Sequence, residues 1–126
     1  MQKKRILIVD DEEYVRTLLL ESLKIYDYEI DVVENGIEAL NQIEKKSYHL
    51  VITDYKMPKM DGLELTRRIK SKHPFTPILV VTSDGPVCHL LKTGATACIN
   101  KPFNLLELQD MVRAILDKED AYARPV

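Results

Sequence analysis

Four short apolar runs in this chain each end on, or just before, a residue that can handle phosphate or a metal ion. The residues at these ends are Asp10 with Asp11, Asp54, Thr82 and Lys101. If the runs are parallel strands of one sheet, their carboxyl ends lie at the same edge, where open parallel sheets place their sites. Three carboxylates, one hydroxyl and one ammonium group would then converge. Such a set suits Mg²⁺ together with a phosphoryl group.

Each carboxylate also has a purely structural interpretation. Asp10 and Asp11 can give Mg²⁺ one direct ligand and one through water, or they can form an acidic loop that begins a helix. Asp54 can attack phosphorus and become an aspartyl phosphate, or it can be a residue that only forms a turn. The combination is more specific than any of its parts.

Thr82 and Lys101 have the chemistry to contact phosphoryl oxygens through a hydroxyl and an ammonium group. Taken singly, a threonine at a strand end and a surface lysine are structural in most proteins. Pro102 sharpens the case, because a cis Lys101–Pro102 bond would aim the lysine back across the strand ends. Only about 5–6% of such bonds are cis, so this expectation depends on the other residues.

The periodicity predicts a chain that alternates between strands and helices. Apolar, β-branched runs predict strands at 5–9, 29–33, 49–53, 78–82 and 97–99. Apolar stripes and capping signals predict helices at 12–25, after the Asn35–Gly36 turn, from Asp61 or Gly62, from Gly85–Pro86 to Gly94, and in a last segment that ends near Glu119. The fold class is therefore α/β, a doubly wound five-stranded parallel sheet. Right-handed crossovers give the order 2-1-3-4-5, with the switch point between strands one and three.

Composition narrows the class of protein. The chain has 126 residues, a net charge of −2, 45% hydrophobic and 30% charged residues, which fits one globular domain. We find no apolar run of bilayer length and no signal peptide, and the near-neutral charge does not indicate nucleic-acid binding. Cys88 and Cys98 have no metal-type spacing. We therefore expect a cytoplasmic domain that acts without a membrane.

Several motifs resemble the receiver domain of bacterial two-component response regulators, of the chemotaxis-receiver type. The resemblance covers residues 5 to about 119, so that residues 1–126 form a single receiver domain with 120–126 as a tail or the start of a linker. The run from Asp54 to Gly62, of the pattern Asp-x-x-Met-Pro-x-Met-Asp-Gly, is the most specific. The other matching motifs are Val9-Asp10-Asp11-Glu12, Val81-Thr82-Ser83, Gly94-Ala95 and Lys101-Pro102-Phe103.

This resemblance implies a flavodoxin-like (βα)5 fold and a phosphorelay function. Asp54 is then the phosphoacceptor, and Mg²⁺ or Mn²⁺ is held by Asp10, Asp11, Asp54 and the backbone carbonyl of Lys56. Thr82 is the switch hydroxyl and Lys101 contacts the phosphate. The implied partners are a sensor histidine kinase or a histidine phosphotransfer protein, and a downstream effector or output domain. A homodimer through the face of the fourth helix, fifth strand and fifth helix is also implied.

The chain departs from the family pattern at three places. Cys98 stands three residues before the lysine, where the family usually has an aromatic switch residue, and we interpret it as a small buried hydrophobe. The stretch from Thr82 to Lys101 is about one turn shorter than usual, which predicts a shortened fourth helix. Lys56 and Asp84 flank the path of an attacking water, and one hypothesis is that they pair and slow loss of the phosphoryl group. The alternative is two unrelated solvated charges.

Two other functions stay open at this stage. The first is a phosphohydrolase with an aspartyl-phosphate intermediate, as in haloacid-dehalogenase-like phosphatases. Those enzymes carry a second aspartate two residues after the nucleophile, where this chain has Lys56. The second is a degenerate receiver that binds partners without phosphorylation, an alternative kept open by Cys98 and the short helix. The sequence leaves open whether the chain is a stand-alone regulator or part of a longer protein.

Overall fold

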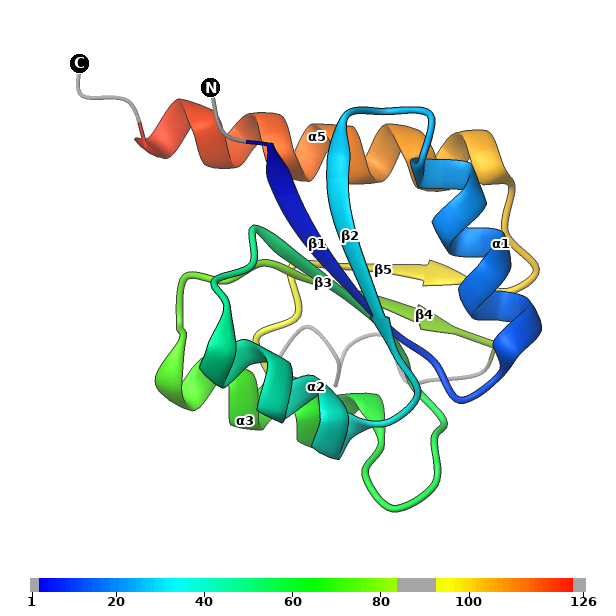
Figure 1. Ribbon diagram of the computed structural model, residues 1–126, viewed down its shortest axis with the longest axis vertical. Helices are drawn as coiled ribbons and strands as arrows, with labels where there is room; N and C mark the ends of the chain where they lie inside the picture. Colours follow the sequence, from blue (N-terminus) through cyan, green and yellow to red (C-terminus); the bar gives the residue numbers. More distant parts are fainter. Residues whose placement is uncertain (1–2, 84–92, 124–126) are drawn as a thin grey trace.

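A single parallel sheet forms the centre of the molecule (Figure 1). The structure is a computed structural model that describes residues 3–83 and 93–123, with side chains as far as Lys118. Its strands are β1 (Lys4–Val9), β2 (Tyr28–Val33), β3 (Leu50–Asp54), β4 (Ile78–Thr82) and β5 (Ala97–Asn100). Its helices, within those residues, are α1 (Glu13–Leu23), α2 (Gly36–Lys45), α3 (Gly62–Lys72) and α5 (Leu105–Ala123).

The strand order is β2-β1-β3-β4-β5, and all neighbours are parallel, as predicted from the sequence. Figure 1 shows α1 and α5 on one face of the sheet and α2 and α3 on the other. This is the doubly wound arrangement, in which the strand order reverses between β1 and β3 while all strands stay parallel. β2 lies at an edge, which explains why its sequence alternates whereas β3 and β4 are apolar along their whole length.

Alternate residues of the central strands supply two separate apolar cores. Leu7, Val51 and Val80 pack with residues of α2 and α3 such as Ala39 and Ile69. The neighbouring residues of the same strands pack on the other face with α1 and α5, in a cluster that includes Ile6, Ile8, Ile52, Leu79, Leu19, Leu23, Leu108 and Val112. Both faces of the sheet are therefore covered, and β1, β3 and β4 are held rigidly.

The ends of two helices differ from the sequence prediction. The first helix ends at Leu23 rather than residue 25, because the amide of Tyr26 turns back to the carbonyl of Leu23. The last helix continues to Ala123, past the end predicted near Glu119. Its final residues lack Gly and Pro, and polar residues on a solvated helix do not end it. The short fourth helix predicted from Gly85–Pro86 lies outside the described residues, and so does Cys88.

No helix of the described part is long and apolar enough to cross a membrane.

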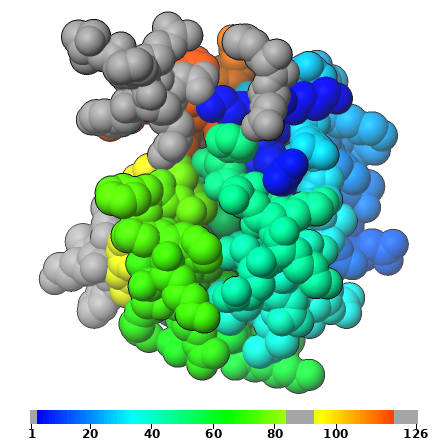
Figure 2. All heavy atoms as spheres, turned by 60° about the vertical axis from the view of Figure 1, so that its left-hand side comes forward, coloured from blue at the N-terminus to red at the C-terminus, as the bar shows by residue number. Residues whose placement is uncertain are grey.

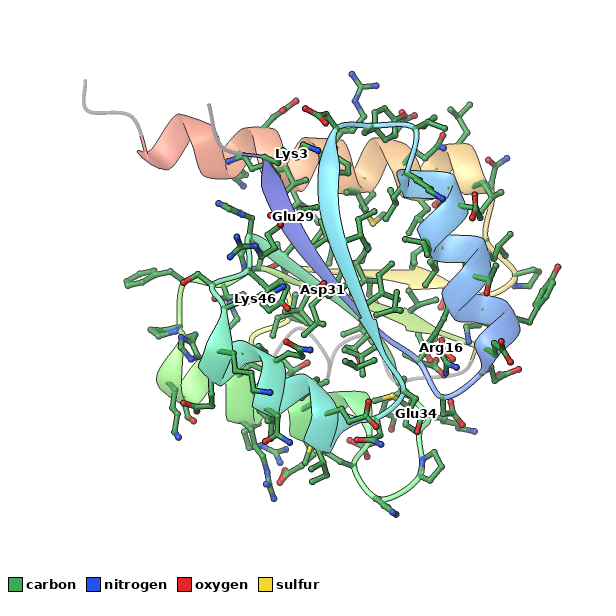
Figure 3. The ribbon with its side chains drawn as sticks, in the orientation of Figure 1. Lys3, Arg16, Glu29, Asp31, Glu34 and Lys46 are labelled. Carbon is green, nitrogen blue, oxygen red and sulfur yellow. The ribbon has the colours of Figure 1, made fainter. Side chains whose placement is uncertain are left out.

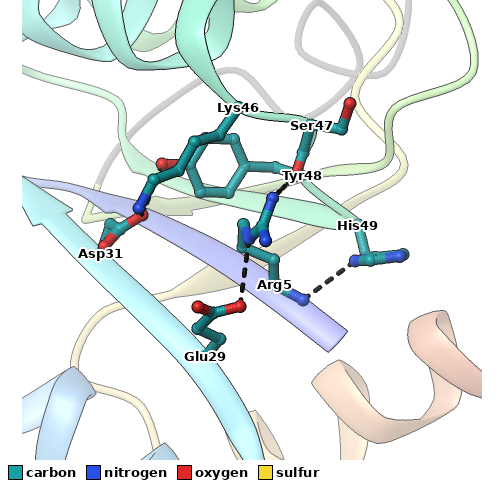
Figure 4. A network of polar contacts seen from close by, with 7 residues as sticks. All are labelled: Arg5, Glu29, Asp31, Lys46, Ser47, Tyr48 and His49. Carbon is teal, nitrogen blue, oxygen red and sulfur yellow. Dashed lines mark hydrogen bonds and ion pairs between the residues drawn. The ribbon is translucent and has the colours of Figure 1, made fainter. Parts of the chain in front are cut away.

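A polar network lies near the amino-terminal ends of β1 and β3, beside β2 (Figure 4). The Tyr48 hydroxyl donates to Asp31 Oδ2 at 2.6 Å, and the Lys46 ammonium lies 3.2 Å from the same oxygen. The Arg5 guanidinium bridges Glu29 of β2 and the carbonyl of Ser47. Burial raises the pKa of Asp31, but the bonds from Tyr48 and Lys46 outweigh it and hold the pKa below its usual value. The network ties β2 to the segment that leads into β3.

We expect Tyr48→Phe to lower the free energy of unfolding by about 1–2 kcal/mol at pH 7, because the charged form of Asp31 loses a partly buried hydrogen bond. Because the pKa of Asp31 is lowered in the folded state, its charged form stabilises the fold at pH values above the pKa of the unfolded state. This contribution is lost as the pH falls through the pKa of the folded state. The difference between variant and wild type should therefore shrink below about pH 4. Urea denaturation at both pH values measures it.

Tyr14→Phe is the matched control, because Tyr14 is 76% exposed and the substitution removes the same hydroxyl. We expect no change in its unfolding free energy. An equal loss in both variants, or a Tyr48→Phe effect that does not depend on pH, would contradict this account of the network.

Candidate functional site

The register of the sheet brings the predicted site residues to one edge. Val9 of β1 pairs with Thr53 of β3, so the next residues, Asp10 and Asp54, leave the two strands side by side. Asp54 pairs with Val81 of β4, which places Thr82 one step beyond it. The amide of Lys101 donates to the carbonyl of Thr82 at 2.7 Å. The neighbouring strand ends thus supply neighbouring side chains.

Asp10 is the most buried of the three acids, with 1% of its surface exposed. Its Oδ1 accepts a hydrogen bond from the amide of Glu12 at 2.9 Å, whereas its Oδ2 is buried and has no hydrogen-bond partner among the described residues. Burial raises the pKa of Asp10 to about 6, against the bond from Glu12 and with help from the charge of Asp54. A buried oxygen of this kind calls for a cation or a proton.

Asp54 is also buried and is held from two sides. The amide of Tyr55 donates to its Oδ1 at 2.9 Å, and the ammonium of Lys101 lies 3.2 Å from the same atom. Burial raises the pKa of Asp54, and the positive charge of Lys101 opposes this. Both contacts are made to Oδ1, so the second carboxylate oxygen is the one from which a new bond can form.

Asp11 completes the acidic cluster. It is exposed, and one carboxylate oxygen from each of Asp10, Asp11 and Asp54 can be chosen so that the three lie within 4.8 Å of one another. An all-oxygen donor set is the one that Mg²⁺ or Mn²⁺ prefers, and Asp10 Oδ2, which accepts no hydrogen bond among the described residues, is available to such an ion. The residues present therefore fit a divalent cation.

Lys101 links two of the acids. Its Nζ lies 3.2 Å from Asp54 Oδ1 and 3.9 Å from Asp10 Oδ2, and the Lys101–Pro102 peptide bond is cis, as the sequence hypothesis required. Thr82 is buried at the end of β4, with 1% of its surface exposed. The predicted hydroxyl and ammonium groups thus lie at the strand ends beside the acids.

The turn that follows Asp54 supports it closely. The Asp61 side chain caps α3 by accepting from the amide of Glu64 at 2.9 Å, and the amide of Gly62 donates to the carbonyl of Tyr55 at 2.7 Å. A Cβ on Gly62 would lie 2.5 Å from the backbone oxygen of Asp54. Only glycine allows α3 to begin this close to the end of β3.

The other residues predicted for the site include Cys98, Lys56 and Asp84. Cys98 is half-buried in β5 beside Val80, and burial raises the pKa of its thiol, as expected for a small hydrophobe. Lys56 is exposed in the loop after β3. Asp84 lies outside the described residues, so its pairing with Lys56 stays a hypothesis.

The sequence prediction missed two groups that contact the acidic residues, the backbone amide of Tyr55 and the side chain of Arg16. The backbone amide of Tyr55 has no sequence signal at all. Arg16 donates to the carbonyl of Asp10 at 2.7 Å, and its signal is a charged residue one and a half turns after Asp10, beside the apolar stripe of the first helix.

A separate hollow lies away from this edge, over the face formed by α2 and α3 (Figure 2). It has a volume of about 320 Å³ and is lined by Leu40, Asn41, Ile43, Glu44, Arg68, Ile69, Ser71, Lys72 and His73. Within the lining, Lys72 and Glu44 form an ion pair at 3.3 Å, so their charges offset each other. The lining includes none of Asp10, Asp11, Asp54 and Lys101.

Comparison with known proteins identifies the family. The family model for the response regulator receiver domain matches residues 6–113. The chain belongs to this family. A solved receiver domain protein (CheY-like) from Methanospirillum hungatei JF-1 has a TM-score of 0.92 to this receiver domain, 30% identity, and coverage of 97% of this chain and 100% of that one.

Curated relatives agree with the family assignment. The probable transcriptional regulator ycf27 of Pyropia yezoensis is 38% identical over 122 residues, which are 94% of this chain and 50% of that protein. The response regulator MprA of Mycobacterium sp. (strain KMS) is 39% identical over 115 residues, 89% of this chain and 50% of that protein. The chain spans about half the length of these relatives. The domain is accordingly a signalling module of the two-component type.

We expect Gly62→Ala to be more harmful than Gly36→Ala, although both residues follow the N-cap of a helix. A Cβ on Gly62 meets backbone at 2.5 Å, whereas a Cβ on Gly36 meets the flexible side chain of Met60, with the Sδ atom at 2.6 Å. We predict a loss of about 2–3 kcal/mol of unfolding free energy for Gly62→Ala and a clearly smaller loss for Gly36→Ala. Chemical denaturation compares the two. Equal losses would contradict the close approach of α3 to Asp54.

We expect Asp10→Asn to stabilise the domain at pH 7.5 without divalent cations. A folded pKa raised to about 6 means that the folded state binds the proton more tightly than the unfolded state. Stability contributed by this proton is present at low pH and is lost as the pH rises from about 4 to about 6. The variant avoids this loss, so it should be about 2 kcal/mol more stable at pH 7.5 and no more stable near pH 4.

Denaturation in the presence of EDTA at the two pH values measures this effect. Asp110→Asn, on the exposed side of α5, removes the same charge and should change stability little at either pH. A destabilised Asp10→Asn at pH 7.5 would show that the carboxylate is better compensated than its burial implies.

Proposed function

We propose that Asp54 of this receiver domain accepts a phosphoryl group from a histidine kinase or a histidine phosphotransfer protein. The observation that supports this most strongly is the convergence of Asp10, Asp11 and Asp54 to within 4.8 Å of one another, with the Lys101 ammonium 3.2 Å from Asp54. An Asp54 carboxylate oxygen forms the new bond to phosphorus, and the bond from phosphorus to the imidazole nitrogen of the donor breaks. The product is an aspartyl phosphate.

A Mg²⁺ or Mn²⁺ ion, held by Asp10, Asp11 and Asp54, supplies neutralisation of charge on the phosphoryl oxygens when bound. The backbone carbonyl of Lys56 is the further ligand that the family resemblance implies. Asp10 would hold the ion while its Oδ1 accepts the hydrogen bond from the amide of Glu12, since its Oδ2 accepts no hydrogen bond among the described residues. The carboxylate is thus oriented before the ion arrives.

Lys101 and Thr82 act on the incoming group in this mechanism. The Lys101 ammonium already lies against Asp54, so it can shift its contact to a phosphoryl oxygen without crossing the site. The Thr82 hydroxyl, at the end of the next strand, donates to another oxygen. Charge-assisted bonds of this kind are the strong ones, and they pull the ends of β4 and β5 toward Asp54.

Phosphorylation then changes the surface around β5 and α5. We propose that the readout does not use an aromatic ring at the position of Cys98, because a half-buried thiol cannot fill or leave the same volume. The Thr82 hydroxyl, drawn toward the phosphoryl group, takes that role. The partner is an effector, an output domain or a second copy docked on the face of the fourth helix, β5 and α5. Relatives named as transcriptional regulators and twice as long favour an output domain.

This function makes the domain a phosphorylated switch and not a phosphohydrolase with turnover. Its own chemistry is limited to accepting the phosphoryl group and losing it slowly to water. Lys56 stands where a haloacid-dehalogenase-like phosphatase has its second aspartate, and a lysine cannot act there as that general acid and base. We place the function in the cytoplasm, where kinases draw on ATP.

Phosphorylation by a small phosphodonor tests the proposal. We expect wild-type protein incubated with acetyl phosphate and Mg²⁺ to gain one phosphoryl mass, and Asp54→Asn to gain none. EDTA should abolish the gain in the wild type, because charge on the phosphoryl oxygens is no longer neutralised. Intact-mass spectrometry reads all three.

Asp110→Asn is the matched control and should be phosphorylated like the wild type. A wild type that gains no mass would favour the degenerate receiver. Repeated turnover of a phosphate monoester would favour the phosphohydrolase.

A further inference from the structure

Asp10 and Asp11 lie where the chain leaves the sheet, so their backbone needs holding. The amide of Asp10 donates to the carbonyl of Val33 at 3.2 Å, which ties it to β2. On the other side, Nη1 of Arg16 donates to the Asp10 carbonyl at 2.7 Å. Figure 3 shows Arg16 and Glu34 near the carboxyl ends of β1 and β2. A side chain of α1 thus reaches back to the strand from which its own helix departs.

That single bond fixes more than one atom. The peptide group between Asp10 and Asp11 is planar, so a donor on its carbonyl also sets where the Cα of Asp11 lies. The Asp11 side chain makes no hydrogen bond or ion pair within the described part of the chain, and the residue is exposed. Its direction therefore depends on the backbone that Arg16 holds.

We propose that Arg16 is a positioning residue for the divalent cation. It holds the Asp10–Asp11 peptide in the orientation in which both carboxylates face the same ion as Asp54. This inference rests on the proposed function, in which these three acids share Mg²⁺. Arg16 does not touch the ion and acts only through the backbone of Asp10.

Two roles for Arg16 predict opposite results when it is removed. If its positive charge were what mattered, its loss would remove a repulsion and tighten the binding of Mg²⁺. If it positions the ligands, its loss loosens them and weakens binding. Outer-shell partners of metal ligands typically change affinity by about 10–100-fold, and the backbone of Asp10 keeps its second anchor at Val33. We therefore expect the low end of that range.

The test is a titration of the phosphoryl-free domain with MgCl₂, followed by the amide NMR signals of Asp11 and Glu12. We expect Arg16→Ala to raise the dissociation constant for Mg²⁺ about tenfold. Arg16→Lys, which keeps a donor that can reach the carbonyl, should recover most of the affinity. Arg67→Ala removes the same charge from an exposed ion pair with Glu64 and should leave the dissociation constant unchanged.

Thermal unfolding of each variant separates this role from a structural one. A residue that only supports the start of α1 would lower the melting temperature and leave the dissociation constant of the folded domain as it was. An unchanged or lower dissociation constant in Arg16→Ala overturns the proposal. Asp10→Asn is measured alongside: if it still binds Mg²⁺ like the wild type, the proposed cation site itself fails, whatever Arg16 does.

Discussion

Burial of two carboxylates beside a third is the constraint around which this domain is arranged. Asp10 and Asp54 are buried, and the pKa values of both are raised. The Lys101 ammonium offsets part of this cost, but Asp10 Oδ2 is left without a hydrogen bond among the described residues. Without a cation, this arrangement lowers the stability of the folded state. Binding of positive charge removes part of that cost, so a change of charge at the site has a large effect on the free energy of the domain.

The rest of the fold keeps these charges from moving apart. Two apolar cores hold β1, β3 and β4 from both faces, so the strand ends cannot move apart to expose these charges to water. Gly62 lets α3 begin directly against the backbone of Asp54, and the polar network around Asp31 fastens the opposite edge of the sheet.

The sequence predicted the strand order, and it predicted that Asp10, Asp11, Asp54 and Lys101 lie together, because both follow from short-range patterns. Apolar runs followed by Asp, Thr or Lys mark strand ends, and the doubly wound topology then brings those ends together. The end of the last helix was predicted too early, because a polar segment without Gly or Pro can continue a solvated helix as well as fray. The bond from Arg16 to the Asp10 carbonyl was missed for another reason. It depends on how α1 turns back over β1, which no periodicity records.

The central claim is that Asp10, Asp11 and Asp54 share one divalent ion. A crystal structure of the domain grown with Mn²⁺, with anomalous data, tests it most directly. We expect one anomalous peak among the three side chains, coordinated by carboxylate oxygens at roughly 2.1 Å either directly or through one water. A structure at saturating Mn²⁺ with no peak there, or with Asp10 and Asp54 turned away from each other, would contradict the account.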